Sequence, residues 1–366
     1  MNGAGAVLRT LVDGGVEVCF TNPGTSEMHF VAGLDTTPRL RGVLCLFEGV
    51  ATGAADGYGR MAPGPASTLL HLGPGLGNGL ANLHNARRAR TPIVNIVGDH
   101  ALYHKHLDAP LESDIDAMAG TVSAWVRRSQ STGAAGSDTA DAIAAARAGG
   151  IATLILPADV SWSPGGVAAT VPAAPAPVLD EVALVRAARA LRDEKPCVLL
   201  LGGAVLRRDG LLAASRIATA TGATVLAENA PARHERGAGL PDIERLPYFG
   251  EQAAARFAGS RCLILAGARS PVSFFAYPDQ PSELVPEKTT VYGIDGTVAA
   301  LEHLADLVAA VSAVRAPVGR SGRRAGASSG RASAATRSAR CSSAATVPSI
   351  PYTVVSSGTS SLGWSG

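Results

Sequence analysis

The fold is decided by residues 42–60, which read Gly42-Val43-Leu44-Cys45-Leu46-Phe47-Glu48-Gly49-Val50-Ala51-Thr52-Gly53-Ala54-Ala55-Asp56-Gly57-Tyr58-Gly59-Arg60. The apolar run before Glu48 predicts a buried strand, and the small residues after it predict a tightly packed helix. A single carboxylate at this junction lies near apolar neighbours, so it must be paired, hydrogen-bonded or protonated. Glu48 is therefore a candidate for proton chemistry. The plain structural alternative is a carboxylate that faces the positive end of a helix dipole.

Strand and helix patterns alternate from residue 1 to about residue 163. Strands are expected near residues 16–20, 43–47, 66–72, 93–97 and 151–156, and helices near 4–14, 26–34, 48–60, 78–90 and 138–148. This alternation predicts a parallel sheet with helices on both faces, which is a three-layer α/β/α domain.

A second alternating section follows a Pro/Ala-rich linker at residues 164–180. Helices are expected at 181–193 and 211–221, and strands at 198–201, 224–227, 262–266 and 290–294. Residues 181–315 are therefore predicted to form a central, Rossmann-like α/β domain. The predicted fold class is α/β, with two parallel-sheet domains.

The composition changes abruptly at about residue 316. Ser, Ala, Arg and Gly dominate residues 316–366, and apolar periodicity ends. Such a segment cannot bury enough surface to order itself, so we predict a disordered tail. A basic interaction segment and a frameshifted extension are the two explanations, and the abruptness of the change favours the second.

The charge distribution argues against a nucleic-acid partner. Seven of the 32 basic residues follow Asp306, which leaves 25 in the rest of the chain against all 30 acidic residues. This slightly acidic body has no basic footprint for nucleic acid. No signal peptide and no span of about 18 apolar residues is found, so we expect a soluble cytoplasmic protein without a membrane partner.

The five cysteines stand far apart in the sequence. They are Cys19, Cys45, Cys197, Cys262 and Cys341. No CxxC pair occurs, so neither a zinc ribbon nor a redox motif is supported. The first four lie in apolar runs, and we expect them to be small core residues.

A tight turn, Asn22-Pro23-Gly24, joins a predicted strand to a predicted helix. The hydroxyl groups of Thr25 or Ser26 could cap that helix by accepting from its free N–H groups. The same N–H groups could instead hold a substrate carboxylate. Taken alone, the turn favours capping.

The glycine-rich segment from His71 to Gly79 also joins a strand to a helix. Its glycines permit a close approach of the backbone to a ligand. The spacing matches neither a dinucleotide fingerprint nor a P-loop. A histidine at a strand end is more often a hydrogen-bonded core residue than a catalyst, so the segment is a weak signal by itself.

Three histidines, His100, His104 and His106, lie near Asp99 and Asp108. A metal site there is conceivable, but the spacing fits no familiar metal motif. We expect a loop over the active site instead and predict no metal ligands.

Together these segments resemble the pyrimidine-binding domain of thiamine-diphosphate-dependent enzymes. The resemblance rests on the Asn22-Pro23-Gly24 turn, on Phe47-Glu48 with the small residues through Arg60, and on the Gly73–Asn78 segment, in this order along the chain. Proteins like the acetolactate synthase large subunit are the nearest in pattern. Benzoylformate decarboxylase is similar in Asn22-Pro23-Gly24-Thr25-x-Glu27 and in Leu70-His71-x-x-x-Gly75-x-Gly77-Asn78. The resemblance covers about residues 1–315.

The resemblance implies roles for individual residues. The glutamate at position 48 would bond N1′ of the aminopyrimidine of thiamine diphosphate, and the cofactor would serve as electron sink in decarboxylation or carboligation of a 2-oxo acid. His71 would handle protons on the substrate, and Thr25 with Ser26 would meet the substrate carboxylate. Cofactor contacts are implied for Pro23, Gly24, Gly75, Gly77 and Asn78.

The chain departs from this family in one respect. Members carry a further domain with a Gly-Asp-Gly…Asn-Asn signature that binds the diphosphate through Mg²⁺, and residues 1–366 contain no such signature. We therefore expect either an incomplete enzyme, paired as a homodimer or with a chain that supplies this domain, or a noncatalytic subunit of a complete homologue. Some relatives bind FAD or ADP in the central domain, but Gly202-Gly203 and Gly267-Ala268-Arg269 are too generic to decide that question.

Overall fold

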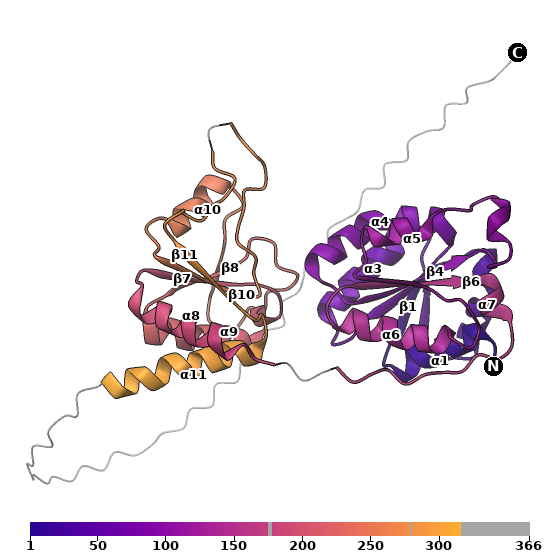
Figure 1. Cartoon of the computed structure of the whole chain (residues 1–366), viewed down its shortest axis with the longest axis horizontal. Coiled ribbons are helices and arrows are strands. Elements are labelled where there is room, and N and C mark those ends of the chain that lie inside the picture. Colours follow the sequence, from indigo (N-terminus) through magenta and orange to yellow (C-terminus); the bar gives the residue numbers. More distant parts are fainter. Residues whose placement is uncertain (175–177, 279, 316–366) are drawn as a thin grey trace, which may run out of the picture. The chain divides into compact units, whose positions relative to one another are not determined.

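Two parallel β-sheets, each lying between layers of helices, form the described part of the chain (Figure 1). The structure is a computed structural model that describes residues 1–174, 178–278 and 280–315. The predicted α/β class with two three-layer units is confirmed, whereas the predicted tail at 316–366 lies outside the described residues. The exact domain boundaries at 163 and 181 stay predictions. Within the described ranges, no helix is both long and apolar enough to cross a membrane.

The first sheet has six parallel strands in the order β2-β1-β3-β4-β6-β5. Their bounds are β1 Val18–Asn22, β2 Arg41–Leu44, β3 Ala66–Leu70, β4 Ile93–Asp99, β5 Trp125–Arg128 and β6 Ile151–Pro157. The strands β3, β4 and β6 are buried along their whole length. Because helices cover both faces of these central strands, the sequence shows continuous apolar runs there rather than alternation.

Helices cover both faces of the first sheet, as Figure 1 shows for α3, α4 and α5 on one face and α1 and α6 on the other. Their bounds are α1 Gly3–Asp13, α3 Glu48–Met61, α4 Leu72–Ala89, α5 Ile115–Gly120 and α6 Ala135–Arg147, with α2 Met28–Asp35 and α7 Ala158–Trp162 packed near α1. Two 3₁₀ turns complete this unit, η1 Thr25–Glu27 and η2 Lys105–Leu107. Each face has its own apolar core, one centred on α1 and α6 and one on α3 and α4.

The second sheet has five parallel strands in the order β11-β10-β7-β8-β9. Their bounds are β7 Cys197–Leu201, β8 Thr224–Ala227, β9 Glu244–Arg245, β10 Cys262–Ala266 and β11 Thr290–Ile294. One face is covered by α8 Glu181–Asp193, α9 Arg208–Thr221 and α11 Val298–Arg315, and the other by α10 Gly250–Phe257. The 3₁₀ turn η3 Gly203–Leu206 follows β7. At the start of α8, Asp180 accepts a hydrogen bond from the Ala183 N–H at 2.9 Å and caps the helix.

The prediction of a buried strand before Glu48 is wrong. The strand β2 lies at the edge of the first sheet and ends at Leu44, so its apolar run has a neighbour on one side only. Leu44 is 70% exposed and Leu46 is 93% exposed. Leu44, Leu46 and Phe47 therefore form an exposed apolar surface next to Glu48, although Cys45 between them is buried.

The glycine-rich segment after His71 is the start of a helix rather than a loop. The helix α4 begins at Leu72, six residues before the predicted start at Asn78. Its glycines allow close packing on α3: a β-carbon at Gly79 would lie 2.9 Å from the Thr52 Cγ2 methyl group. The two helices are consequently in close contact near Glu48.

Cys197 and Cys262 are core residues, as predicted, but they are joined by a disulfide rather than free. The strands β7 and β10 place them opposite each other in the ladder, with their Cα atoms 4.8 Å apart. Their 65-residue separation hides this pairing in the sequence. Cys19 and Cys45 are buried free thiols.

Candidate functional site

Three predicted site segments meet at one edge of the first sheet. Gly24 follows β1, Glu48 follows β2, and His71 follows β3. Because these strands are parallel neighbours, with Thr21 paired to Leu44 and Asn22 to Leu70, their carboxyl ends lie together. In open parallel sheets, ligands bind beside this edge.

Glu48 is the first residue of α3 and is only 8% exposed. Its Oε2 accepts a hydrogen bond from the Asn78 Nδ2 at 3.0 Å. No basic side chain in the described ranges forms an ion pair with it. Upstream, the Asn22 side chain donates to the Cys45 carbonyl at 2.8 Å and fixes the segment that leads to Glu48. The carboxyl group is thus secluded and held by an uncharged amide.

Gly75 lies between the two predicted catalytic side chains. A β-carbon on Gly75 would lie 3.2 Å from Glu48 Oε1 and 3.5 Å from the Cβ atom of His71. This glycine therefore leaves Oε1 uncovered, and no hydrogen bond to Oε1 is formed within the described chain.

His71 is held by the turn after β1. Its Nδ1 lies 2.8 Å from Glu27 Oε2, and the same carboxylate oxygen accepts from the Gly24 N–H at 2.7 Å. Gly24 packs directly on the imidazole, since a β-carbon there would lie 2.4 Å from ring atoms Cε1 and Nδ1. Burial raises the pKa of the Glu27 carboxyl, although the Gly24 N–H and His71 act in the opposite direction.

Glu27 is the residue of this site for which the sequence alone predicts no role. Its place in the Asn22-Pro23-Gly24-Thr25-x-Glu27 pattern was visible in the sequence. What the pattern could not show is that a carboxylate near a helix start turns inward, to a histidine 44 positions away.

The other predicted site residues are not all brought together. Neither Thr25 nor Ser26 caps a helix, so the capping interpretation is wrong. Their hydroxyl groups form no hydrogen bond within the described chain. Pro23 is half-buried in the turn. Gly77 faces Met118 of α5, since a β-carbon on Gly77 would lie 3.4 Å from the Met118 Cε, and no atom of Glu48 or His71 lies within 4 Å of that β-carbon position.

The histidine segment after β4 does not gather metal ligands. Asp99 is fully buried and forms ion pairs with Lys105, at 3.1 Å, and with Arg128. His100 bonds the Pro110 carbonyl at 3.1 Å. Across the described residues, no cluster of three or more His, Cys, Asp or Glu side chains could hold a metal ion. Further along the same connection, Ser113 packs on the start of α4, because a β-carbon on Gly73 would lie 2.1 Å from Ser113 Oγ.

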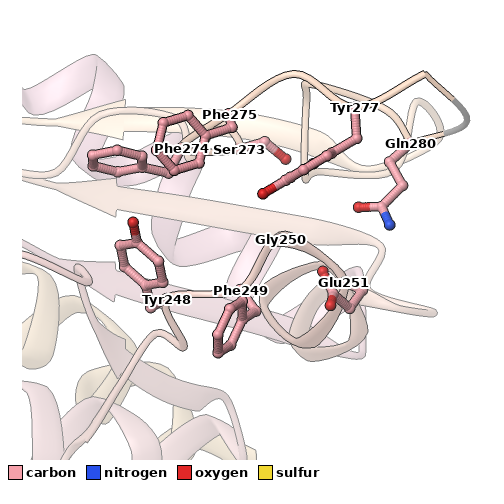
Figure 2. Close-up of a pocket in the computed structure, with 9 residues that line it drawn as sticks. All are labelled: Tyr248, Phe249, Gly250, Glu251, Ser273, Phe274, Phe275, Tyr277 and Gln280. Carbon is pink, nitrogen blue, oxygen red and sulfur yellow. The ribbon is translucent and has the colours of Figure 1, made fainter.

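A separate hollow of about 270 Å³ lies on the second unit (Figure 2). Tyr248 and Phe249 form one side, and Phe274, Phe275 and Tyr277 form the other. The glycines of the Gly202-Gly203 and Gly267-Ala268-Arg269 segments do not line it. The question of FAD or ADP binding therefore stays a prediction.

Residues 1–119 match the family model described as "Thiamine pyrophosphate enzyme, N-terminal TPP binding domain". This part of the chain is thus similar to the N-terminal domain of thiamine-pyrophosphate enzymes. The matched residues include the three turns that carry Gly24, Glu48 and His71. The chain is thereby grouped with enzymes, as its sequence pattern implied.

Relatives extend this similarity along the chain. IlvX of Mycobacterium tuberculosis, an acetolactate-synthase-large-subunit-like protein, is 62% identical over 314 residues, which cover 84% of this chain and 61% of IlvX. Benzoylformate decarboxylase of Pseudomonas aeruginosa is 34% identical over 103 residues, which cover 28% of this chain and 19% of that enzyme. The chain thus spans less than two thirds of the length of these two relatives.

A solved structure shows the same fold. The thiamine diphosphate-dependent 4-hydroxybenzoylformate decarboxylase of Rhodococcus jostii RHA1 superposes with a TM-score of 0.72 at 21% identity, over 84% of this chain and 62% of that chain. At this level of identity the likeness establishes the architecture of both α/β units and no more.

Proposed function

We propose that this chain forms the pyrimidine-binding half of a thiamine-diphosphate-dependent enzyme that decarboxylates or joins 2-oxo acids, as acetolactate synthase does. The observation that carries the proposal is Glu48, a carboxyl group only 8% exposed, bonded to the Asn78 amide and free of any cation in the described ranges. The match to the family model supports the cofactor, and the similarity to IlvX supports the reaction class.

The residues present fit the pyrimidine end of this cofactor. Asn78 occupies Oε2 of Glu48, while Gly75 leaves Oε1 without a covering side chain. Oε1 can therefore bond a ring nitrogen and share a proton with it. When bound, thiamine diphosphate supplies the electron sink for decarboxylation. In the proposal, Gly24, Pro23 and Gly75 shape the wall beside the ring, and Gly77 supports α4 against Met118.

The proposed role of His71 is to hold or move a proton on the substrate. Its side chain is 23% exposed, so it can reach a ligand at the sheet edge. The free hydroxyl groups of Thr25 and Ser26 lie on the same turn as Gly24 and are proposed to meet the substrate carboxylate.

A second chain is proposed to complete the site. Exposed apolar residues lie on both sides of Glu48, namely Leu46, Phe47 and Val50. Apolar surfaces of this kind often mark a site of contact with another protein. The partner would be a second copy or a chain that carries the diphosphate-binding domain with its Mg²⁺ ligands. A noncatalytic subunit of a complete homologue is the second candidate, and the same apolar surface supports it.

Calorimetry with thiamine diphosphate and Mg²⁺ tests the need for a partner. We expect no binding at micromolar concentration by the chain alone, and binding after a chain with a diphosphate-binding domain is added. Micromolar binding by the chain alone would contradict the proposed division of the site.

Turnover of pyruvate and of benzoylformate by the assembled pair tests the role of Glu48. Glu48→Gln should lower kcat by about 10²- to 10⁴-fold, the usual contribution of a positioned proton-transfer group. Glu17→Gln is the matched control, because Glu17 is an exposed carboxylate of the same unit. Full activity of Glu48→Gln would sink the proton role, and a pair that binds the cofactor without turnover would favour the noncatalytic subunit.

A further inference from the structure

Glu27 is the most deeply buried carboxylate beside the proposed site after Asp99, and unlike Asp99 it has no Lys or Arg partner. The residue is 2% exposed. Its Oε2 receives the Gly24 N–H at 2.7 Å and lies 2.8 Å from His71 Nδ1, while its Oε1 is buried without a hydrogen-bond partner. Burying a carboxylate costs free energy unless hydrogen bonds compensate for the lost water, so the contacts of Glu27 with Gly24 and His71 must stabilise it.

The surrounding chain makes room for this carboxyl group. A β-carbon at Gly98 would lie 1.6 Å from Glu27 Oε1, so only glycine leaves space for it in β4. On the other side, Gly24 supplies an N–H to the carboxylate and a flat contact to the imidazole. Gly24, in the turn after β1, and Gly98, in β4, therefore hold one carboxyl–imidazole pair.

We infer that Glu27 is a positioning residue that accepts the Nδ1 proton of His71 and so leaves Nε2 as the nitrogen that exchanges a proton with the substrate. This inference rests on the proposed function of His71. The hydrogen bond at one ring nitrogen decides which nitrogen of a neutral imidazole carries the proton. Because Nδ1 is engaged by Glu27 and Nε2 has no partner in the described chain, the ring has one nitrogen available for chemistry.

The tautomer of His71 can be measured without cofactor or turnover. The ¹⁵N resonances of labelled histidine rings in the full chain, recorded at pH 8, separate a protonated from a bare ring nitrogen. We expect His71 to carry its proton on Nδ1, with Nε2 bare, in the wild-type chain. A His71 ring protonated on Nε2 would overturn the inference.

Three variants separate positioning from a merely structural role. Glu27→Gln keeps an acceptor oxygen and should keep the Nδ1–H tautomer. Glu27→Leu removes the acceptor, so the preference for the Nδ1–H tautomer should be lost. Gly98→Ala should have the same effect, because its new methyl group would displace the Glu27 carboxyl group. Gly293→Ala is the matched control, since Gly293 also lies in a strand and a β-carbon there meets nothing within 4 Å. An unchanged tautomer in folded Glu27→Leu would also overturn the inference.

Kinetics in the assembled pair give an independent arm. Glu27→Leu should lower kcat by about as much as His71→Ala, roughly 10²-fold or more for a lost proton-transfer group. The double variant should be no slower than His71→Ala alone, because both changes remove one function. Additive losses would show that Glu27 acts elsewhere. If the wild-type pair shows no turnover, the proposed function fails. The ¹⁵N result still decides the inference about Glu27.

Discussion

Thr52 Oγ1 lies 3.1 Å from the Gly79 carbonyl oxygen, across the contact between α3 and α4. This contact matters because α3 carries Glu48 and α4 carries Asn78, so the two helices must stay close for their side chains to bond. Gly79 permits the approach by having no side chain. The packing of small residues predicted from residues 49–60 thus positions the proposed proton group.

Gly79→Ala should weaken the fold. The new methyl group would lie 2.9 Å from Thr52 Cγ2 and 3.4 Å from Leu70 Cδ1 in a buried contact. Overpacking typically costs about 1–3 kcal/mol, and the gain of about 1 kcal/mol in helix propensity offsets part of it. Urea unfolding should therefore show a net loss of up to about 2 kcal/mol. Gly57 also lies in α3 but has open space around it, so Gly57→Ala should instead stabilise the folded chain by about 0.5–1 kcal/mol. Equal effects of both substitutions would contradict the packing argument.

Asn78→Ala should destabilise the chain through Glu48. The substitution leaves a buried carboxylate oxygen without its donor at 3.0 Å. Such a loss costs about 1–3 kcal/mol, measured as the free energy of unfolding. Asn85→Ala is the control, because Asn85 is exposed on the same helix and should change stability by less than about 0.5 kcal/mol. If both substitutions cost the same, the Asn78–Glu48 bond contributes nothing.

Leu46→Glu should disrupt association without affecting the fold. Leu46 is 93% exposed, so a charge there costs little in the isolated chain, within about 0.5 kcal/mol. At a partner interface, the buried charge would weaken binding by several kcal/mol. Sedimentation velocity should show loss of the dimer or of the complex with a diphosphate-domain chain. Val178→Glu is the control, because Val178 is 89% exposed in the predicted linker, and it should leave association unchanged. If association survives Leu46→Glu, the interface lies elsewhere.

The stability of the chain should depend on pH through Glu27. Burial raises the pKa of this carboxyl group in the folded chain, so the folded state favours the protonated form. The resulting stabilisation is complete below the unfolded pKa of about 4.3 and is lost as the pH rises through the higher folded pKa.

Glu27→Gln cannot titrate, so the comparison of unfolding free energies isolates this contribution. Wild type should lose stability relative to Glu27→Gln as the pH rises, by about 1.4 kcal/mol for each unit by which the folded pKa exceeds the unfolded one. The exposed Glu17→Gln should follow wild type at every pH. A difference between wild type and Glu27→Gln that shrinks with rising pH would mean that the partners of Glu27 outweigh its burial.

The sequence predicted most strands of both sheets because their apolar runs are long and bounded by turns. The helix at 181–193 and the strands at 224–227, 262–266 and 290–294 agree with α8, β8, β10 and β11 at both ends. Edge elements are harder to predict. The apolar side chains of β2 suggest burial although most of the strand is exposed, and the short edge strands β5, which is mostly half-buried, and β9, which is exposed, have no clear pattern. Glycines misled at α4, because propensity disfavours them in helices whereas packing against Thr52 requires them. Glu48, Asn78 and His71 could be found from local pattern, but the Glu27–His71 contact depends on the pairing of β1 with β3.

The disulfide between Cys197 and Cys262 should be detectable and stabilising. Non-reducing peptide mapping of the denatured chain should yield one linked peptide that contains both residues. A crosslink that closes a 65-residue separation stabilises by roughly 4 kcal/mol in the chain-entropy model. The Cys197→Ala/Cys262→Ala double variant should therefore unfold at clearly lower urea concentration, whereas Cys45→Ala, at a free thiol, should lower the free energy of unfolding much less.

Alkylation distinguishes the free thiols from the disulfide. Cys19 should resist alkylation of the native chain at pH 9, because burial raises the pKa of its thiol to about 12. Alkylation of both Cys197 and Cys262 after denaturation without reductant would show that the two thiols are free and that β7 and β10 are held by the ladder and the core alone.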